Sequence, residues 1–393
     1  MKIFFADPIG HILGLHDKEI CRYLAQKGHK VILATNEKYP FLNAESEFEQ
    51  ITPFKGIVGN YNFVLKGINY VRSLIRVWRQ ICRFQPDVVI YYYILQITLD
   101  NLFIRNLRNH GIPTILGAHD ILPLSSNKEY CHSYHKIYNN ATVILAFSEY
   151  GKNQLISNFG IPLSKIQVVF LGMNEGKKTF CRKDQIISRE KLGLQIDEPI
   201  ILCFGQIKKN KGLKYLLDAF AGVLVQEPKA RLLVIGRPWK VSLKPYFEQV
   251  KRLGIGQRVL FRSELVSEEV AEDFLIASDV VVLPYTYLYQ SAVLPLACSV
   301  GKPIIATRVG NISEILQDGE TGYLVPPADA KALEEVMLDV ISNPEEAQRR
   351  GYRAQEMMQK NYSWERFGKE LEKTLEKVTV TVHRRDTETQ RKN

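Results

Sequence analysis

Short apolar segments bounded by turn residues recur along the whole chain, and segments with helical periodicity separate them. Residues 2–6, 31–35 and 88–93 begin the series, and Gly28 ends the first helical segment. Such runs are typical of buried parallel strands, and two parallel strands joined by a helix form a right-handed unit. The alternation therefore predicts a doubly wound α/β domain in the amino-terminal half. Its later strands are expected at residues 114–116, 143–147 and 168–170.

A polar connection at residues 173–199 interrupts this alternation, and its charged composition is typical of an interdomain linker. The 393 residues also exceed the size at which a single core stops growing, roughly 250–300 residues. The second series has strands expected at residues 200–204, 231–235, 259–261, 280–284, 303–307 and 322–325, with helices near 213–227, 243–253, 268–277 and 330–342. We expect Rossmann-like domains at 1–176 and 177–360, a helix at 361–378 that packs back towards the first domain, and a frayed tail at 379–393.

Composition narrows the compartment and the class of partner. No run of about 18 uncharged apolar residues occurs. Asp7 stands where a signal peptide would need apolar continuation. The six cysteines form no Cys-x-x-Cys pair, which is typical of reduced thiols in a cytoplasmic protein. The formal charge of +10 leaves nucleic acid, a membrane surface and a phosphorylated ligand open as partners.

A basic helical segment helps to choose among these partners. Residues 51–86 contain six basic side chains and no acidic one, and four of the six share a helix face: Arg72, Arg76, Arg79 and Arg83. One interpretation is an ordinary helix that packs its apolar residues, from Val71 to Cys82, on a sheet and solvates its arginines. The other is a membrane-facing helix, where each basic residue contributes about 1 kcal/mol of attraction to anionic lipid.

Two segments at the ends of expected strands carry residues suited to chemistry. The loop at 204–212, F-G-Q-I-K-K-N-K-G, has a glycine where the backbone turns and several ammonium groups, which suits an anionic ligand as well as a solvated basic turn. His119 could bond a substrate hydroxyl, shuttle a proton or fix a loop. Ser148 is expected to cap a helix or to belong to a site. No zinc-binding, nucleophile-elbow or Walker motif occurs, so we expect no metal ion.

The stretch at 283–314 leads from an apolar strand through a polar turn to a helix that is expected to open on Gln290 and Ser291. Unpaired backbone N–H groups at a helix start favour an anion. The stretch contains no Asp or Glu before Glu314.

Taken together, these segments resemble the family 4 glycosyltransferases, retaining enzymes of the GT-B fold. The resemblance covers nearly the whole chain, and it depends on the order and spacing of its pieces. These are Q-K-G-H-K-V at 26–31, G-A-H-D at 117–120, F-S-E-Y-G-K at 147–152, the 204–212 loop, A-S-D-V-V-V-L-P-Y at 277–285, Q-S-A-V-L-P-L-A at 290–297 and D-G-E-T-G-Y-L-V-P-P-A-D at 318–329. The resemblance implies two Rossmann-like doubly wound domains facing across a cleft.

The resemblance also implies roles for individual residues. Lys211 matches the lysine that contacts the donor diphosphate, and His119 matches the histidine near the transferred sugar. Gln206 stands where the family has an arginine, with Lys208 taking over part of that charge. The family's E-x7-E carboxylates fall at Leu288 and Leu296, so both are missing. The remaining implied contacts are Gly205 and the backbone amides of Gln290, Ser291 and Ala292 on the donor, and an acceptor-side loop with Gly10, His11 and Gly14.

The expected activity follows from the resemblance. It implies metal-independent, retaining transfer of a hexose-type sugar from a nucleotide-sugar to a glycan or lipid-linked acceptor, in surface polysaccharide or glycoconjugate synthesis. We expect no cofactor besides the donor substrate, no nucleic acid partner, and a cytoplasmic protein with the inner membrane face as a possible peripheral site. Two alternatives stay open: a non-catalytic nucleotide-sugar-binding subunit, and a sugar-nucleotide epimerase.

Overall fold

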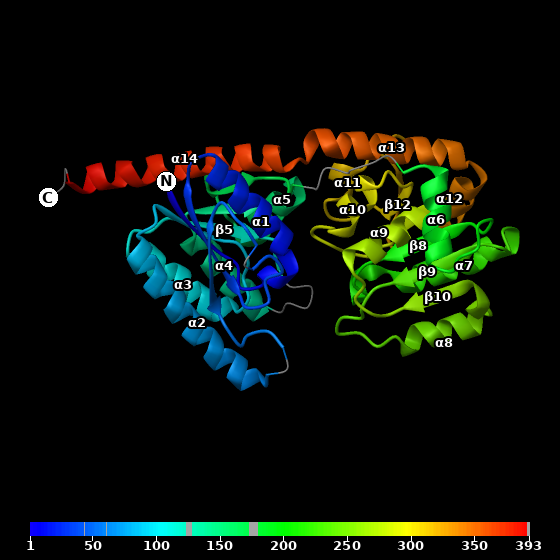
Figure 1. Cartoon of the computed structure of the whole chain (residues 1–393), viewed down its shortest axis with the longest axis horizontal. Helices are drawn as coiled ribbons and strands as arrows, with labels where there is room; N and C mark the ends of the chain where they lie inside the picture. The colour runs from blue at the N-terminus through cyan, green and yellow to red at the C-terminus, as the bar shows by residue number, and fades with distance from the viewer. Residues whose placement is uncertain (43, 60, 123–127, 173–179, 391–393) are drawn as a thin grey trace. The chain divides into compact units, whose positions relative to one another are not determined.

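The chain divides into two compact units (Figure 1). The computed structural model describes residues 1–42, 44–59, 61–122, 128–172 and 180–390. The first unit combines Met1–Gly172 with Trp364–Asn393, and the second is Met173–Ser363. The first unit thus ends at Gly172 rather than at residue 176, and the helix that follows residue 363 belongs to it.

Within the described residues, the first unit contains a seven-stranded sheet of order β3-β2-β1-β4-β5-β6-β7, and all neighbouring strands are parallel. The prediction missed β3, because its sequence E-Q-I-T-P-F is polar and holds a proline, which suits only an edge strand. The strands are β1 (Lys2–Ala6), β2 (Lys30–Asn36), β3 (Glu49–Phe54), β4 (Val88–Tyr91), β5 (Thr114–Ala118), β6 (Val143–Ala146) and β7 (Ile166–Val168).

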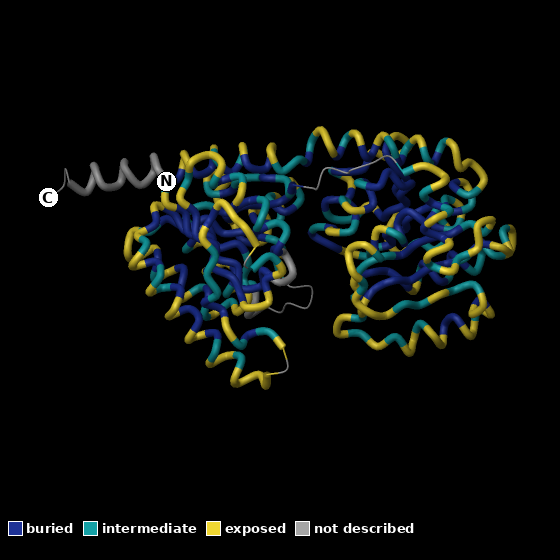
Figure 2. Tube along the Cα trace, in the orientation of Figure 1, coloured by how far each residue is buried: buried dark blue, intermediate teal, exposed yellow. Residues whose placement is uncertain are grey.

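Helices connect these strands. The central strands of both units are buried, the edge strands β3 and Val259–Arg262 are only partly so, and the helices expose their outer faces (Figure 2). The helices of the first unit are α1 (Gly10–Gln26), α2 (Phe63–Phe84), α3 (Ile97–Asn109), α4 (Lys128–Asn140), α5 (Glu149–Phe159) and α14 (Trp364–Gln390). Ser148 caps α5, because its Oγ accepts a hydrogen bond of 2.9 Å from the Gly151 N–H. This settles the interpretation of Ser148 in favour of the cap.

Helix α14 completes the core of the first unit. Its buried side chains recur at helical spacing and join the apolar strand residues of the sheet: Phe367, Leu371, Leu375 and Val378. The helix continues to Gln390, and no Gly or Pro interrupts it at 379–390. The frayed tail expected from residue 379 stays a prediction. Residues 391–393 lie outside the described part.

The second unit holds a six-stranded parallel sheet in the described residues, of order β10-β9-β8-β11-β12-β13. The strands are β8 (Ile200–Phe204), β9 (Arg231–Ile235), β10 (Val259–Arg262), β11 (Val280–Leu283), β12 (Ile304–Thr307) and β13 (Tyr323–Val325). Its helices are α6 (Arg182–Lys191), α7 (Leu213–Gln226), α8 (Lys244–Leu253), α9 (Glu268–Ala277), α10 (Val293–Ser299), α11 (Ile312–Ile315), α12 (Ala330–Ser342) and α13 (Pro344–Asn361).

Both sheets therefore reverse strand order at one point, between β1 and β4 in the first and between β8 and β11 in the second. In doubly wound sheets the carboxyl ends of the strands at such a switch point form the usual ligand site. We therefore expect the functional side chains in the loops that follow these four strands.

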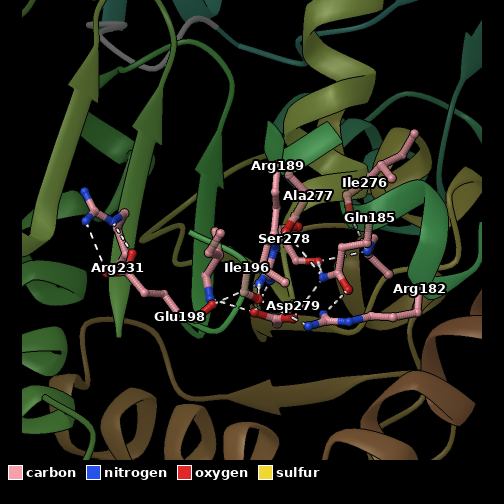
Figure 3. Close-up of polar contacts among 12 residues, drawn as sticks. Arg182, Gln185, Arg189, Ile196, Glu198, Arg231, Ile276, Ala277, Ser278 and Asp279 are labelled. Atoms are coloured by element: carbon pink, nitrogen blue, oxygen red, sulfur yellow. Dashed lines mark hydrogen bonds and ion pairs between the residues drawn. The ribbon is translucent and has the colours of Figure 1, made fainter. Parts of the chain in front are cut away.

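A buried arginine fixes α6 to the sheet of the second unit (Figure 3). The Arg189 guanidinium is 2.7 Å from Asp279 Oδ2, and its Nε donates a 2.9 Å hydrogen bond to the Ala277 carbonyl. Gln185 Nε2 donates to Asp279 Oδ1 at 2.9 Å. Because the charge of Arg189 is paired and its donors are used, this network holds the start of β11 in place and has a structural role.

Candidate active site

Lys211 is buried at the carboxyl end of β8. The side chain is 1% exposed, and its Nζ donates hydrogen bonds to the Phe204 carbonyl and to Tyr285 Oη, the latter at 3.2 Å. The ammonium also lies 4.6 Å from the centre of the Tyr285 ring. No carboxylate among the described residues forms an ion pair with it. Lys211 is thus a buried cation held by neutral groups.

The electrostatics of Lys211 keep it charged. Burial opposes the charged form, but Tyr285 and Cys203 outweigh burial and the pKa of Lys211 is raised. A buried charge without a counter-ion is costly in a folded protein. An anionic ligand would supply the missing negative charge.

The loop that carries Lys211 is joined to the loop that follows β11. The Thr286 N–H donates to the Asn210 carbonyl at 2.9 Å, and Asn210 Nδ2 donates to the Tyr287 carbonyl at 2.6 Å. Gly205, with φ +102°, lies close to the start of α10, since a Cβ there would lie 2.6 Å from Val293 Cγ2 and 3.6 Å from Lys211 Nζ. The structure therefore brings Gly205, Lys211 and the start of α10 together at the switch point of the second sheet.

The other residues predicted in this loop are less buried than Lys211. Gln206 is exposed and Lys208 is half-buried. No described carboxylate pairs with Lys208 either. Both side chains remain at the surface of the loop, so Lys211 is the buried cation of this segment and Lys208 is a second, solvated one.

Helix α10 begins later than the sequence predicts. The prediction that it opens on Gln290 and Ser291 is wrong, because the first helical residue is Val293 and the Ser291 hydroxyl acts as a cap that accepts from the Leu294 N–H at 3.1 Å. Within the described residues, the backbone N–H groups of Gln290, Ser291 and Ala292 have no hydrogen-bond acceptor. These amides therefore remain available to a ligand from a turn rather than from a helix end.

The two positions of the missing carboxylates differ in surroundings. Leu288 is 4% exposed and packs close to Gly310, where a Cβ would lie 3.2 Å from Leu288 Cγ. Leu296 is 39% exposed on α10. Neither leucine can replace the hydrogen bonds of a carboxylate, so this side of the site is apolar.

His119 follows β5 in the first unit and lies among aromatic rings. The imidazole stacks on Phe147 with ring centres 4.3 Å apart and meets Tyr92 edge-on at 4.6 Å. The residue is partly exposed, yet its Nε2 is shielded from solvent and has no partner in the described part of the chain. Burial, with a smaller effect of His16, lowers the pKa of His119 to about 3. The ring is therefore neutral at physiological pH and cannot act as a cation.

Gly10 and Gly14 were predicted in an acceptor-side loop, but they lie in a helix, because α1 begins at Gly10. Their place on the acceptor side stays a prediction. A Cβ on Gly10 would overlap Thr35 Oγ1, and one on Gly14 would lie 2.7 Å from Pro40 Cγ. Close packing at the carboxyl ends of β1 and β2 thus explains both glycines. His11 is in the same helix, and its side chain lies outside the described residues.

A buried pair of acids at the switch point of the first sheet was not found from the sequence. Asp7 follows β1, Asp17 lies in α1, and both are completely buried. Asp7 Oδ1 accepts a 2.7 Å hydrogen bond from the Ile9 N–H. The Asp7 and Asp17 side chains can share a hydrogen bond when one of them is protonated, and their remaining oxygens have no other partner among the described residues. The sequence does contain one indication of a buried acid. Asp17 falls on the apolar stripe of the helix that continues at Ile20 and Leu24.

Burial and mutual repulsion keep this pair partly protonated. Burial raises the pKa of Asp7 to about 7, and burial together with the charge of Asp7 raises the pKa of Asp17 well above its usual range. Two further unpaired hydroxyls, Thr35 Oγ1 and Tyr92 Oη, are buried in the same part of the sheet edge. The first switch point is therefore polar and close to neutral.

The four membrane-facing candidates, Arg72, Arg76, Arg79 and Arg83, are all exposed on α2. No helix in the described residues is long and apolar enough to cross a membrane. The same part of the chain contains no cluster of three or more His, Cys, Asp or Glu side chains that could hold a metal ion.

Two Rossmann-like parallel sheets, with an unpaired cation at the switch point of the second, define the GT-B class of glycosyltransferase. The fold is similar to that of sucrose-phosphate synthase from Thermosynechococcus elongatus (TM-score 0.80, 19% identity, 97% of this chain and all of that chain). It is also similar to Anabaena HepE, solved in complex with UDP-glucose (TM-score 0.78, 18% identity, 96% of this chain and all of that chain).

The sequence comparison gives the family. Residues 15–176 match the model of Glycosyltransferase Family 4, and residues 184–357 match that of Glycosyl transferases group 1. The chain belongs to glycosyltransferase family 4. Its relatives include N-acetyl-alpha-D-glucosaminyl L-malate synthase of Bacillus anthracis, 25% identical over 91% of this chain and 92% of the relative. An uncharacterized glycosyltransferase of Methanocaldococcus jannaschii is 27% identical, but the match spans only 60% of each protein.

Proposed function

We propose that this chain is a metal-independent, retaining glycosyltransferase that moves a hexose-type sugar from a nucleotide-sugar to a glycan or lipid-linked acceptor, in surface polysaccharide or glycoconjugate synthesis. The observation that carries the proposal is the buried, unpaired ammonium of Lys211 next to the free backbone amides at 290–292. The diphosphate of a nucleotide-sugar is a ligand that satisfies both.

In the proposed mechanism the acceptor hydroxyl attacks the anomeric carbon from the face that the diphosphate leaves, with no covalent intermediate on the enzyme. The bond from the anomeric carbon to the diphosphate breaks as the new glycosidic bond forms, and the hydroxyl proton passes to an oxygen of the departing diphosphate. Negative charge develops on the departing diphosphate. Lys211, Lys208 and the amides at 290–292 stabilise that charge, which makes electrostatic stabilisation the main contribution of the protein. His119, being neutral, contributes a hydrogen bond near the transferred sugar rather than a proton.

The experiment that tests this role replaces Lys211 by alanine. Turnover should fall about 10²-fold or more, because a positioned donor at developing charge is lost. Lys209→Ala is the matched control, since Lys209 is an exposed lysine of the same loop. Near wild-type transfer by Lys211→Ala, in a variant that unfolds at the wild-type temperature, would refute the role.

The donor base is the first property to determine. HepE was solved with UDP-glucose, and another relative is a GDP-mannose-dependent mannosyltransferase of Mycolicibacterium smegmatis, 26% identical over 61% of this chain. We therefore propose a thermal-shift screen with UDP, GDP and their sugars, because a ligand selective for the native state raises apparent stability by mass action. A shift with one nucleotide class and none with the other would identify the base.

The second candidate is a non-catalytic nucleotide-sugar-binding subunit. Leu288 and Leu296 favour it, because they remove both carboxylates that the family places near the sugar and the ribose. Saturable nucleotide binding without donor hydrolysis or transfer, over a broad acceptor panel, would support the subunit. Turnover that is lost in Lys211→Ala would exclude it.

A further inference from the structure

Helix α2 uses only part of its circumference to pack on the first unit. Of its 22 residues, those that are buried follow one inner face: Tyr70, Ser73, Leu74, Val77 and Ile81. The remaining faces point to solvent (Figure 2). The side chains on those faces are therefore not needed for packing the core.

One of these faces is apolar. Four exposed residues recur at intervals of four, three and four, so they lie on one side of the helix and form what we name the outer stripe: Val64, Ile68, Val71 and Ile75. Their exposed fractions are 69%, 45%, 42% and 47%. Phe63, 87% exposed at the first residue of the helix, lies off the stripe, because it precedes Val64 by one residue. The interpretation in which Val71 and Ile75 pack on the sheet is wrong, because Leu74 and Ile81 make that contact instead.

A basic face adjoins the outer stripe. Arg72 and Arg79 each follow a member of the stripe by four residues, which places them beside it on an α-helix. With Arg76 and Arg83 they form the arginine stripe, and none of the four is in an ion pair with a described carboxylate. Residues 51–86 contain no acidic side chain that could neutralise them.

These two adjoining stripes limit the kind of partner. The partner must offer an apolar region to the outer stripe and an anionic region beside it to the arginine stripe, over the length of the helix. A second copy of this chain meets the apolar requirement but would bring arginines against arginines, which is unfavourable. A bilayer with anionic headgroups meets both requirements at once, because acyl chains receive the outer stripe and headgroup charges receive the arginines.

We propose that the outer face of α2 is a membrane-docking surface, in which the outer stripe enters the headgroup boundary of an anionic bilayer and the arginine stripe pairs with lipid phosphates. This docking would bring the protein to the lipid-linked acceptor of the proposed function, and its biological role rests on that function. The docking itself requires no turnover, so it can be measured separately.

Sedimentation of the full chain with vesicles tests the proposal. The wild type should bind vesicles of phosphatidylcholine and phosphatidylglycerol and should bind pure phosphatidylcholine weakly, with binding reduced by salt. Replacing two arginines, Arg72→Gln with Arg79→Gln, should weaken binding to anionic vesicles about 30-fold, the effect of two basic residues near a charged surface. Replacing Ile68→Ser with Ile75→Ser should weaken it about tenfold or more through lost apolar burial.

Matched control variants come from the second unit. Lys251→Gln with Arg252→Gln removes the same charge from exposed positions on α8, and Val225→Ser with Leu265→Ser removes exposed apolar side chains. Both controls should bind vesicles like the wild type. Thermal unfolding of every variant should match the wild type, since each replaced side chain is exposed.

Two results would overturn the proposal. One is equal binding to neutral and anionic vesicles that neither α2 variant changes. The other is no vesicle binding together with concentration-dependent association that Ile68→Ser with Ile75→Ser abolishes, which would make the face an interface between copies. Failure of the donor screen would instead count against the proposed function, because sedimentation involves no donor.

Discussion

The buried acids at the first switch point give the sharpest test of the electrostatics in this protein. Asp7→Asn replaces one carboxyl by an amide of the same shape, whose oxygen can still accept the hydrogen bond from the Ile9 N–H. The change removes a buried titrating group next to Asp17. We expect the variant to be more stable than the wild type, in contrast to most changes at buried polar residues.

The magnitude follows from the pKa of Asp7. A rise from 3.8 to about 7 means that the folded state holds a proton which the unfolded state has lost. The free energy of unfolding of the wild type therefore falls as pH rises through this window and levels off above it, by about 4 kcal/mol at most. Asn does not titrate, so the advantage of the variant should be about 2 to 3 kcal/mol larger at about pH 8 than at about pH 5.

Urea unfolding followed by tryptophan fluorescence measures this difference. In a Trp239→Phe background the remaining tryptophans, Trp78 and Trp364, both belong to the first unit, so the signal reports on that unit alone. Comparing variant with wild type at each pH cancels the titrations that do not interact with Asp7. Asp17 does interact with it, and losing the charge of Asp7 lowers the pKa of Asp17, which adds to the advantage of the variant at high pH. A variant that is no more stable at pH 8, or an advantage that does not change with pH, would refute the reasoning.

Asp100→Asn is the matched control, because Asp100 is also completely buried in the first unit but is fully hydrogen-bonded. Its Oδ2 accepts from the N–H groups of Leu95 and Gln96, each at 2.8 Å, and its Oδ1 accepts from Tyr91 Oη at 2.7 Å. An amide cannot accept all of these bonds. Asp100→Asn should therefore destabilise the unit by about 1 to 3 kcal/mol. Burial raises the pKa of Asp100 to about 6, so this loss should be larger at about pH 5 than at about pH 8.

Three further outcomes are expected. Gly212→Ala should lower the free energy of unfolding by about 3 kcal/mol or more, because φ is +73° and a Cβ would overlap the Pro284 carbonyl. Gly254→Ala, at φ +71° with open space around it, should lower it by about 1 kcal/mol. Equal losses in the two variants, measured by thermal unfolding, would contradict this. His119→Asn should lower turnover without changing the shape of its pH dependence above about pH 6, since the imidazole is already neutral. Turnover should persist in EDTA, and a loss restored by Mg²⁺ would contradict metal independence.

Much of the fold was predictable because its strands are short, apolar and bounded by turn residues. The bounds of β8, β9, α9 and α12 coincide with the predicted ones. Periodicity worked there because each helix has a single apolar face. Helix α2 has two, and the sequence does not distinguish the stripe that packs on the sheet from the one that meets solvent. Only the packing of Leu74 and Ile81 decides between them.

The sequence predicted which residues form the candidate site better than it predicted their positions and contacts. The sequence identified Lys211 as a cation in a loop, but its burial against Phe204 and Tyr285 depends on contacts between two loops far apart in the chain. The acids at the first switch point show the same limit. Asp7 and Asp17 lie on different elements, and only the sheet topology brings them together.

The missing carboxylates and the unpaired lysine have a joint consequence for donor recognition. Carboxylates hold a nucleotide-sugar through sugar and ribose hydroxyls, while Lys211 and the amides at 290–292 address the diphosphate. With leucine at 288 and 296, charge on the diphosphate must supply most of the donor affinity. The free nucleoside diphosphate should then bind nearly as tightly as its sugar conjugates, and different sugars on one nucleotide should differ little. Strong discrimination between two sugars would require side chains that the second unit does not present at these positions.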